Sequence, residues 1–145
     1  MNAILVPVES SAKASAAAQR GIAHCLHSLA TVHLLNVQRP FPRHISRFFS
    51  NQELQRFHQE AGMSVLAPAI RALDAAGVPH FDHVVVGQPA RAIVEFAARK
   101  HCDDILLDEA PGGFMSILHA SLSSQVRHLM RAAAAAAAAG PTGTR

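Results

Sequence analysis

The sequence predicts a single α/β domain in which a parallel sheet lies between two layers of helices. Short apolar runs alternate with longer segments of helical periodicity along the chain. Half of the 145 residues are hydrophobic, with seven Phe and no Trp or Tyr, as is typical of buried aliphatic strands under closely packed helices. Strands and helices that alternate at these lengths require parallel strands with right-handed crossovers. We therefore expect a three-layer α/β/α sandwich with four to five strands.

The chain opens with a strand and a helix. Ala3 to Val8 is a continuous apolar run, which is typical of a strand covered on both faces. Ser10 or Ser11 is expected to cap the helix that follows. Small and apolar residues recur at helical spacing and form the expected buried face of this helix: Ala14, Ala17, Ala18, Gly21, Ile22, Cys25, Leu26 and Leu29. The small residues predict a close approach to the sheet.

The second strand is expected at Thr31 to Val37, followed by a connector that contains prolines. The motif Ser50-x-x-Glu53 has the spacing of a capping box and predicts the start of a long helix. The apolar periodicity extends this helix from about Gln52 to Ala76, and Gly77 is the expected stop.

The long helix contains Pro68, which predicts a kink or a break near Leu66, because proline removes a helical hydrogen bond. A third strand is expected at His80 to Val86 and a helix at Ala90 to Lys100. Ile105 to Leu107 forms the core of the expected fourth strand. The predicted order is thus four repeats of a strand followed by a helix.

The end of the chain carries eight consecutive alanines, residues 132–139, followed by Gly140 and Pro141. We expect a domain at 1–131 and an Ala-rich tail of uncertain status at 132–145. As written, the alanines extend the last helix, because alanine has the highest helix propensity. If they stand for unassigned residues, a fifth strand becomes the alternative.

The expected ligand site lies where the strands end. In such folds ligands bind outside the carboxyl ends of the strands, at the point where the strand order reverses. Glu9, Val37, Gly87 and Asp108 mark those ends. The stretch from Ile105 to Val126 combines a strand, a Pro-Gly-Gly turn and a helix rich in serine, an arrangement that holds phosphate at unpaired backbone N–H groups. The loops after strands one and four therefore carry the site hypothesis.

Charge and composition argue against several classes of function. The formal net charge is +3, and the basic residues are mostly scattered, so nucleic-acid binding is not expected. No apolar run reaches the length that crosses a membrane, and no secretory signal precedes the first strand. Cys25 and Cys102 lack metal or redox spacing, which favours a reduced, cytoplasmic setting.

The sequence lacks the usual catalytic and metal-binding motifs. It contains no G-x-S-x-G elbow, no G-x-G-x-x-G after the first strand and no G-x-x-x-x-G-K-[ST]. His24 and His27 are three apart on a helix without a nearby third ligand, so no metal is expected. His80 and His83 are three apart in a strand and are expected to point to opposite faces. We expect no catalytic residue and no metal site.

The chain contains the segments ILVPVESSAKASAAAQRGI, VHLLNV, HVVVGQPARAIVEFAARKHCDDILL and GGFMSILHASLSSQV. From Ile4 to about Leu129, these segments resemble the universal stress protein family. The resemblance implies a sandwich of the adenine nucleotide alpha hydrolase-like type. It also implies an ATP site, in which a glycine-containing loop holds the phosphates and the ends of strands one and two hold adenine. A fifth strand that pairs across a homodimer is a further implication of the resemblance.

The resemblance assigns binding roles to individual residues. It places the adenine side at Pro7, Val8, Glu9 and Val37, and the phosphate side at Asp108, Gly112, Gly113, Ser121 and Ser123. Glu9 replaces the usual aspartate, and Asp108 stands where the first signature glycine belongs. Pro111 falls near the second glycine and Ala120 replaces the last. The loop is one residue short before the glycine pair.

These departures weaken the expected grip on a triphosphate. Asp108 and Glu109 repel phosphate unless Mg²⁺ bridges them, and Pro111 lacks an N–H. We therefore expect a stress-response or signalling protein that acts by binding rather than turnover, with weak or absent ATP binding. Two alternatives stay open. One is a functional Mg-ATP or AMP binder with slow hydrolysis at most, and the other is a dimeric scaffold without ligand.

The connector between the second strand and the long helix is the best candidate for a partner surface. It combines Arg39, Arg43 and Arg47 with Phe41, Phe48 and Phe49, residue types that are favoured at interfaces. The simpler interpretation is that the Phe side chains pack under the following helix.

Overall fold

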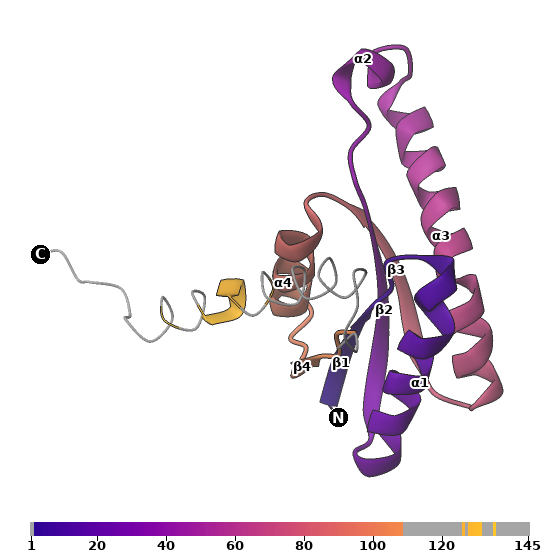
Figure 1. Cartoon of the computed structure of the whole chain (residues 1–145), viewed down its shortest axis with the longest axis vertical. Coiled ribbons are helices and arrows are strands. Elements are labelled where there is room, and N and C mark those ends of the chain that lie inside the picture. The colour runs from indigo at the N-terminus through magenta and orange to yellow at the C-terminus, as the bar shows by residue number, and fades with distance from the viewer. Residues whose placement is uncertain (1, 109–125, 127, 132–134, 136–145) are drawn as a thin grey trace, which may run out of the picture.

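The computed structural model describes residues 2–108, 126, 128–131 and 135, and it confirms the predicted α/β sandwich (Figure 1). Strands and helices alternate along the chain as expected. The elements are β1 (Asn2–Pro7), α1 (Ser11–His27), β2 (Ala30–Gln38), α2 (Arg43–Ser46), α3 (Asn51–Ala75), β3 (His80–Val86), α4 (Pro89–Arg99) and β4 (Asp104–Ile105). Val126, residues 128–131 and Ala135 are also helical.

The described strands form one parallel sheet in the order β3-β2-β1-β4. From β1 the chain moves to β2 and then β3 on one side, whereas β4 pairs with the other side of β1. The strand order therefore reverses between β1 and β4, and ligands of such folds bind at the carboxyl ends of the strands at this point. The carboxyl ends of the first and fourth strands are therefore neighbours.

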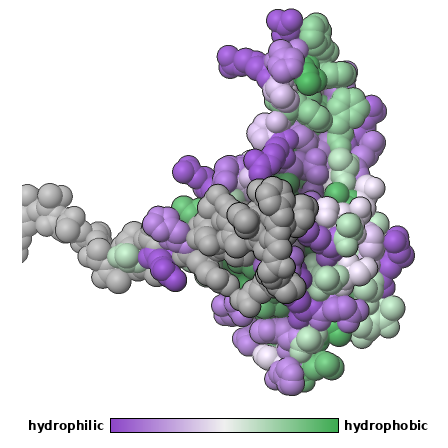
Figure 2. All heavy atoms as spheres, in the orientation of Figure 1, coloured by the Kyte–Doolittle hydropathy of each residue, from purple (hydrophilic) through white to green (hydrophobic). Residues whose placement is uncertain are grey.

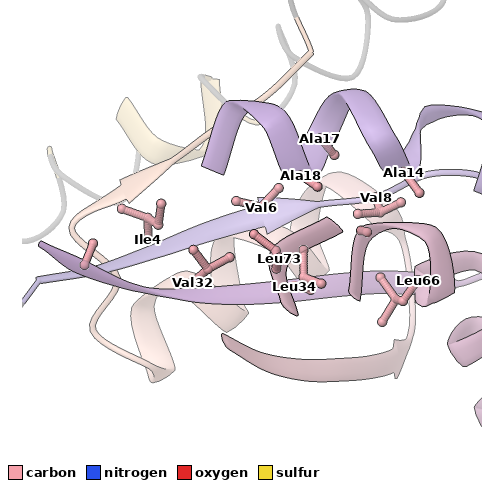
Figure 3. Close-up of a cluster of buried hydrophobic side chains, with 12 residues drawn as sticks. Ile4, Val6, Val8, Ala14, Ala17, Ala18, Val32, Leu34, Leu66 and Leu73 are labelled. Atoms are coloured by element: carbon pink, nitrogen blue, oxygen red, sulfur yellow. The ribbon is translucent and has the colours of Figure 1, made fainter. Parts of the chain in front are cut away.

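Helices cover both faces of the sheet, so the core has two parts. On one face α1 and α3 enclose Ile4, Val6, Val8, Val32 and Leu34 (Figure 3). On the other face α4, with Val126 and Leu129, packs on the alternate residues of the strands, which include Leu5 and Leu35. Burial on both faces explains why the strands are continuous apolar runs and not alternating ones.

The first helix differs from the prediction at both ends. Ser10 occupies the N-cap, but its side chain makes no capping hydrogen bond. Leu26 and Leu29 are 79% and 86% exposed, so their predicted burial is wrong. Leu26 lies about 120° around the helix from Ala14 at 3.6 residues per turn, and Leu29 follows the extended residue Ser28, at which the helical phase has ended.

The long helix α3 begins and ends as predicted but does not break. The Ser50 side chain accepts a hydrogen bond from the Glu53 N–H at 3.1 Å, as expected of the capping box. At the other end, Gly77 has φ +69°, and the N–H of Val78 bonds to Leu73 in a Schellman arrangement. The helix is continuous across Pro68, so of the predicted kink or break the break is wrong.

Packing explains why α3 stays continuous through its proline. Leu66, Ala69 and Leu73 lie on both sides of Pro68 in sequence and are completely buried. Gly62 approaches β3 so closely that a Cβ atom at this position would lie 2.4 Å from Cγ1 of Val84. The apolar contacts that hold α3 on the sheet therefore offset the hydrogen bond that Pro68 removes.

The fourth strand is shorter than predicted and begins one residue earlier, at Asp104–Ile105. Asp103 aligns it, because its backbone N–H donates to the Ala3 carbonyl at 2.7 Å and its carboxylate accepts from the Ala3 N–H at 2.9 Å. One further bond, from the Leu106 N–H to the Leu5 carbonyl at 2.9 Å, continues the alignment. Residues 106–108 thus leave the sheet directly beside the end of β1.

The predicted fifth strand falls largely outside the described residues. Of the eight alanines the structure describes only Ala135, which is helical. Within the described part of the chain, no helix is long and apolar enough to cross a membrane.

Candidate functional site

The end of β1 is fixed to β2 by backbone and side-chain hydrogen bonds. Pro7 is buried, and Val8 is 1% exposed. The Val8 N–H donates to the Leu35 carbonyl at 2.8 Å, which extends the β1–β2 pairing by one residue. The main chain at the expected adenine position is therefore preformed.

Asn36 completes this arrangement from the neighbouring strand. Its side chain is almost fully buried, and its Nδ2 donates to the Val8 carbonyl at 2.8 Å. Its Oδ1 accepts from Nε2 of Gln38 at 2.6 Å. A buried amide is stable only when such partners are present, because an unpaired one costs ~1–3 kcal/mol. Asn36 therefore fixes where the Val8 carbonyl points.

The same network continues into α3 and the connector. Gln38 Oε1 lies 3.4 Å from Nδ1 of the buried His58. Since Gln38 uses its NH₂ group on Asn36, its oxygen is the acceptor, so the pairing calls for a proton on Nδ1 of His58. The His58 ring stacks on Phe41 with 4.5 Å between centroids. A chain of contacts thus connects Phe41 to the backbone of Val8.

The sequence interpretation missed Asn36, Gln38 and His58. The signal was present for Asn36, because a single amide inside the apolar run from Val32 to Val37 must be either buried with partners or exposed at an edge. No local pattern indicates that His58 on α3 meets Gln38, since these two residues are twenty positions apart.

The other predicted residues of this side lie at the same edge of the sheet. Glu9 is exposed, and its Oε2 accepts a hydrogen bond from Nζ of Lys13 at 2.8 Å, one turn along α1. Val37 is partly buried and pairs in register with Val85 of β3. The β1/β2 side of the site, which we define as Pro7, Val8, Glu9 and Val37, is thus assembled from two neighbouring strand ends.

The β4 side of the site is acidic where the structure describes it. Asp108 Oδ1 lies 3.8 Å from Nη1 of Arg20, and both side chains are partly exposed. Nε of Arg20 is buried and has no hydrogen-bond partner among the described residues. An ion pair at this distance and exposure contributes at most ~1 kcal/mol. Asp108 follows β4 and Glu9 follows β1, so two carboxylates belong to adjacent strand ends.

Four predicted phosphate-side residues lie outside the described residues: Gly112, Gly113, Ser121 and Ser123. Pro111 and Ala120 lie there as well. Their roles stay predictions from the sequence.

The histidines and cysteines of the described residues form no metal site, because no group of three or more His, Cys, Asp or Glu is arranged to hold an ion there. On one face of β3, His80 bonds to Asp74 at 2.6 Å and Asp82 at 2.7 Å. On the other face, His83 lies 3.0 Å from His33 and against Phe96 of α4. The predicted opposite orientation of His80 and His83 is confirmed.

The pKa values of these histidines shift in opposite directions. Burial lowers the pKa of His33 and of His83, and the neighbouring cation Lys100 lowers both further. Burial also lowers the pKa of His80, but hydrogen bonds to Asp74 and Asp82 outweigh it, so the net pKa is raised. These groups lie on β2 and β3 and do not belong to the candidate site.

Comparison with protein families gives a match to the universal stress protein family model over residues 1–138. The chain belongs to the universal stress protein family. Its fold resembles that of UspA from Lactobacillus plantarum, with a TM-score of 0.67 at 19% identity over 86% of this chain and 89% of that one. No curated protein matches the sequence at a significant level.

Other solved members of the family share the fold at similar TM-scores and sequence identities. A protein of the family from Burkholderia pseudomallei gives a TM-score of 0.66 at 18% identity, covering 90% of each chain. A universal stress protein solved in complex with cAMP gives 0.64 at 17% identity, covering 88% of this chain and 90% of that one. At these identities the likeness shows the fold, which agrees with the topology described above.

Proposed function

We propose that this universal stress protein acts by binding an adenine nucleotide, with most of the affinity on the adenine side and a weak hold on the phosphates. The observation that carries the proposal is the preformed β1/β2 side. The main chain of Val8 is held by Leu35 and by the buried Asn36, so no ordering cost falls on this segment when a ligand binds. A flat, polar base fits a backbone edge that is already rigid.

The carboxylates that follow β4 and β1 support the proposal that phosphate is bound only weakly. Asp108 places a carboxylate at the switch point beside β1, and Glu9 follows the adjacent strand. Glu9 is paired with Lys13 and Asp108 with Arg20. The two carboxylates keep part of their negative field and oppose a triphosphate unless Mg²⁺ offsets it. Their oxygens are suitable ligands for Mg²⁺, so the ion would help ATP more than AMP.

Binding rather than turnover is supported by the absence from the sequence of a G-x-S-x-G elbow and of a G-x-x-x-x-G-K-[ST] motif. The complex of another universal stress protein with cAMP supports the choice of an adenine ligand, because that ligand combines adenine with a single phosphate. We also propose a cytoplasmic location and a homodimer, as expected for the family.

Isothermal titration with Mg-ATP, AMP and adenosine tests the proposal. We expect Mg-ATP to bind no more tightly than about 100 μM, or roughly −5.5 kcal/mol. AMP and adenosine should bind within about threefold of Mg-ATP, since the shared adenosine supplies most of the binding free energy. A phosphate-release assay should show no hydrolysis above the blank.

Each alternative gives a different result. Mg-ATP affinity in the low micromolar range would show a functional ATP binder and overturn the weak hold on phosphate. Absence of binding by all three ligands, together with a concentration-dependent mass in light scattering, would instead indicate a scaffold without ligand.

A further inference from the structure

The connector and the start of α3 form a lobe that stands away from the sheet (Figure 1). We define the Phe/Arg lobe as residues 39–58. It follows the carboxyl end of β2 and contains α2 and the first turns of α3. Figure 2 shows apolar and strongly polar residues side by side on this projection. The proposed nucleotide site uses none of its exposed side chains.

The positive charge of the protein is concentrated in this lobe. The lobe holds four arginines and one glutamate, whereas the rest of the chain has nine basic and nine acidic residues. The whole formal excess of +3 therefore lies in the lobe. Three of the four arginines are the cluster Arg39, Arg43 and Arg47 that the sequence already shows, and the formal charges of the rest of the chain cancel.

The lobe also exposes apolar side chains that a solvated loop does not need. Phe48 is 72% exposed, and Ile45, Phe49 and Phe41 are each about two-fifths exposed. The Arg47 guanidinium lies 4.9 Å from the centroid of the Phe48 ring, so charge and apolar surface are interleaved. The sequence expectation that the phenylalanines pack under the following helix is thus only partly met, by Phe49 against Phe57 and by Phe41 against His58.

Between α2 and α3 the exposed side chains surround a small apolar pocket of about 220 Å³. Its lining is entirely apolar and consists of Phe41, Ile45, Phe49, Leu54 and Phe57. The pocket is smaller than the ~300–1,000 Å³ sites that hold drug-sized ligands. Its size therefore suits one inserted aliphatic or aromatic side chain.

We propose that the Phe/Arg lobe is a docking site for an acidic peptide segment of a partner protein that inserts one apolar anchor side chain into this pocket. Charge complementarity selects the partner, since Arg39, Arg43 and Arg47 belong to the same lobe as the pocket and no acidic residue occurs between residues 39 and 52. The concave apolar pocket favours a peptide over nucleic acid, whose phosphates offer no anchor, and over a lipid surface, which receives protruding side chains. Arg and Phe are also the residue types enriched at protein interfaces.

Fluorescence anisotropy of the full-length protein with a labelled synthetic peptide tests the proposal. The probe is a twelve-residue peptide of Asp, Glu and Ser with one central Leu-Phe pair. We expect saturable binding that weakens as salt is raised. The double variant R43E/R47E should lose at least tenfold in affinity, because two attractive contacts become repulsive. The control R71E/R91E makes the same change in net charge at exposed positions elsewhere and should stay within twofold.

The apolar half of the proposal has its own variant. Ile45→Trp fills the pocket from an exposed position and should reduce peptide affinity at least fivefold. The control Leu26→Trp enlarges a more exposed apolar side chain on α1 and should leave affinity unchanged. Thermal melting of each variant shows whether the fold is retained.

Three results would overturn the proposal. The first is equal binding of a peptide with Ser in place of the Leu-Phe pair, which would indicate charge attraction alone. The second is an equal loss in the R71E/R91E control. The third is binding to phosphatidylserine vesicles with no binding to the peptide, which would indicate a lipid surface. None of these measurements depends on nucleotide binding.

Discussion

The two sides of the candidate site differ in how they are held. On the β1/β2 side, buried hydrogen bonds from Leu35 and Asn36 fix the main chain of Val8. On the β4 side, a strand of two residues is followed three residues later by Asp108, whose contact with Arg20 is long and partly exposed. Groups that are buried and paired keep one geometry, whereas an exposed charge acts mainly through its field. The same site thus combines a rigid recognition edge with an electrostatic barrier.

The largest expected effect follows from breaking the rigid side. Asn36→Leu keeps the branching of the side chain but removes the amide that bonds to Val8 and Gln38, which leaves buried polar groups without partners. We expect the free energy of unfolding to fall by ~2–3 kcal/mol, measured by urea denaturation. The control Asn51→Leu replaces an exposed asparagine at the start of α3 and should change stability by less than ~0.5 kcal/mol. Unchanged stability of Asn36→Leu would mean that the network is not structural.

A smaller effect is expected from relieving the barrier on the β4 side. Asp108→Asn keeps the shape of the side chain and removes one negative charge near the expected phosphates. Affinity for ATP in the absence of Mg²⁺ should rise about fivefold, or ~1 kcal/mol, because no ion then offsets the carboxylate charge, while adenosine affinity stays the same. Isothermal titration measures both ligands, and Glu95→Gln on the exposed face of α4 is the matched charge control. An equal gain for adenosine would contradict the assignment of Asp108 to the phosphate side.

The smallest expected effect is the change of stability with pH that comes from histidines outside both sides of the candidate site. It shows whether nucleotide titrations can be run at different pH values without altering the fold. The raised pKa of His80 gives stability that is present below about pH 6.5 and is lost as pH rises through its folded value. The lowered pKa values of His33 and His83 act oppositely, since below about pH 6.5 the unfolded chain takes up protons that the folded chain does not.

The two contributions oppose each other between pH 8 and 6. His80→Gln should therefore make the loss of stability on acidification steeper, by a few tenths of a kcal/mol, because these groups are partly screened by solvent. His83→Gln should make it shallower. Urea denaturation at several pH values measures the slopes, and identical slopes in both variants would show that the histidines do not control pH dependence.

Much of the fold was predictable because it depends on local patterns. The apolar runs place β1, β2 and β3 to within two residues, and Ser50 and Gly77 mark the ends of α3 through cap geometry that depends only on nearby residues. The wrong predictions involve long-range packing. Pro68 is tolerated because buried neighbours hold α3 on the sheet, and Leu26 is exposed because of how α1 is rotated on it.

The candidate site was predictable only in part for the same reason. Pro7, Val8, Glu9, Val37 and Asp108 were identified as residues at strand ends, and the strand order brings those ends to one edge of the sheet. Asn36, Gln38 and His58 were missed, because their importance comes from contacts between β1, β2 and α3. The cluster of Arg39, Arg43 and Arg47 with phenylalanines was identified from the sequence, whereas the apolar pocket between α2 and α3 depends on how those two helices pack.

The sequence by itself determined the fold class, the family and the departures from the usual phosphate loop, because hydrophobic periodicity and residue identity are properties of the chain. Only the tertiary structure decided that β4 lies beside β1, that Asn36 donates a hydrogen bond to the Val8 carbonyl and that an apolar pocket opens between α2 and α3. Each of these depends on residues distant in sequence meeting in one place. Contacts between residues distant in sequence depend on the packing free energy of the whole domain, and no local stretch of the sequence determines that free energy.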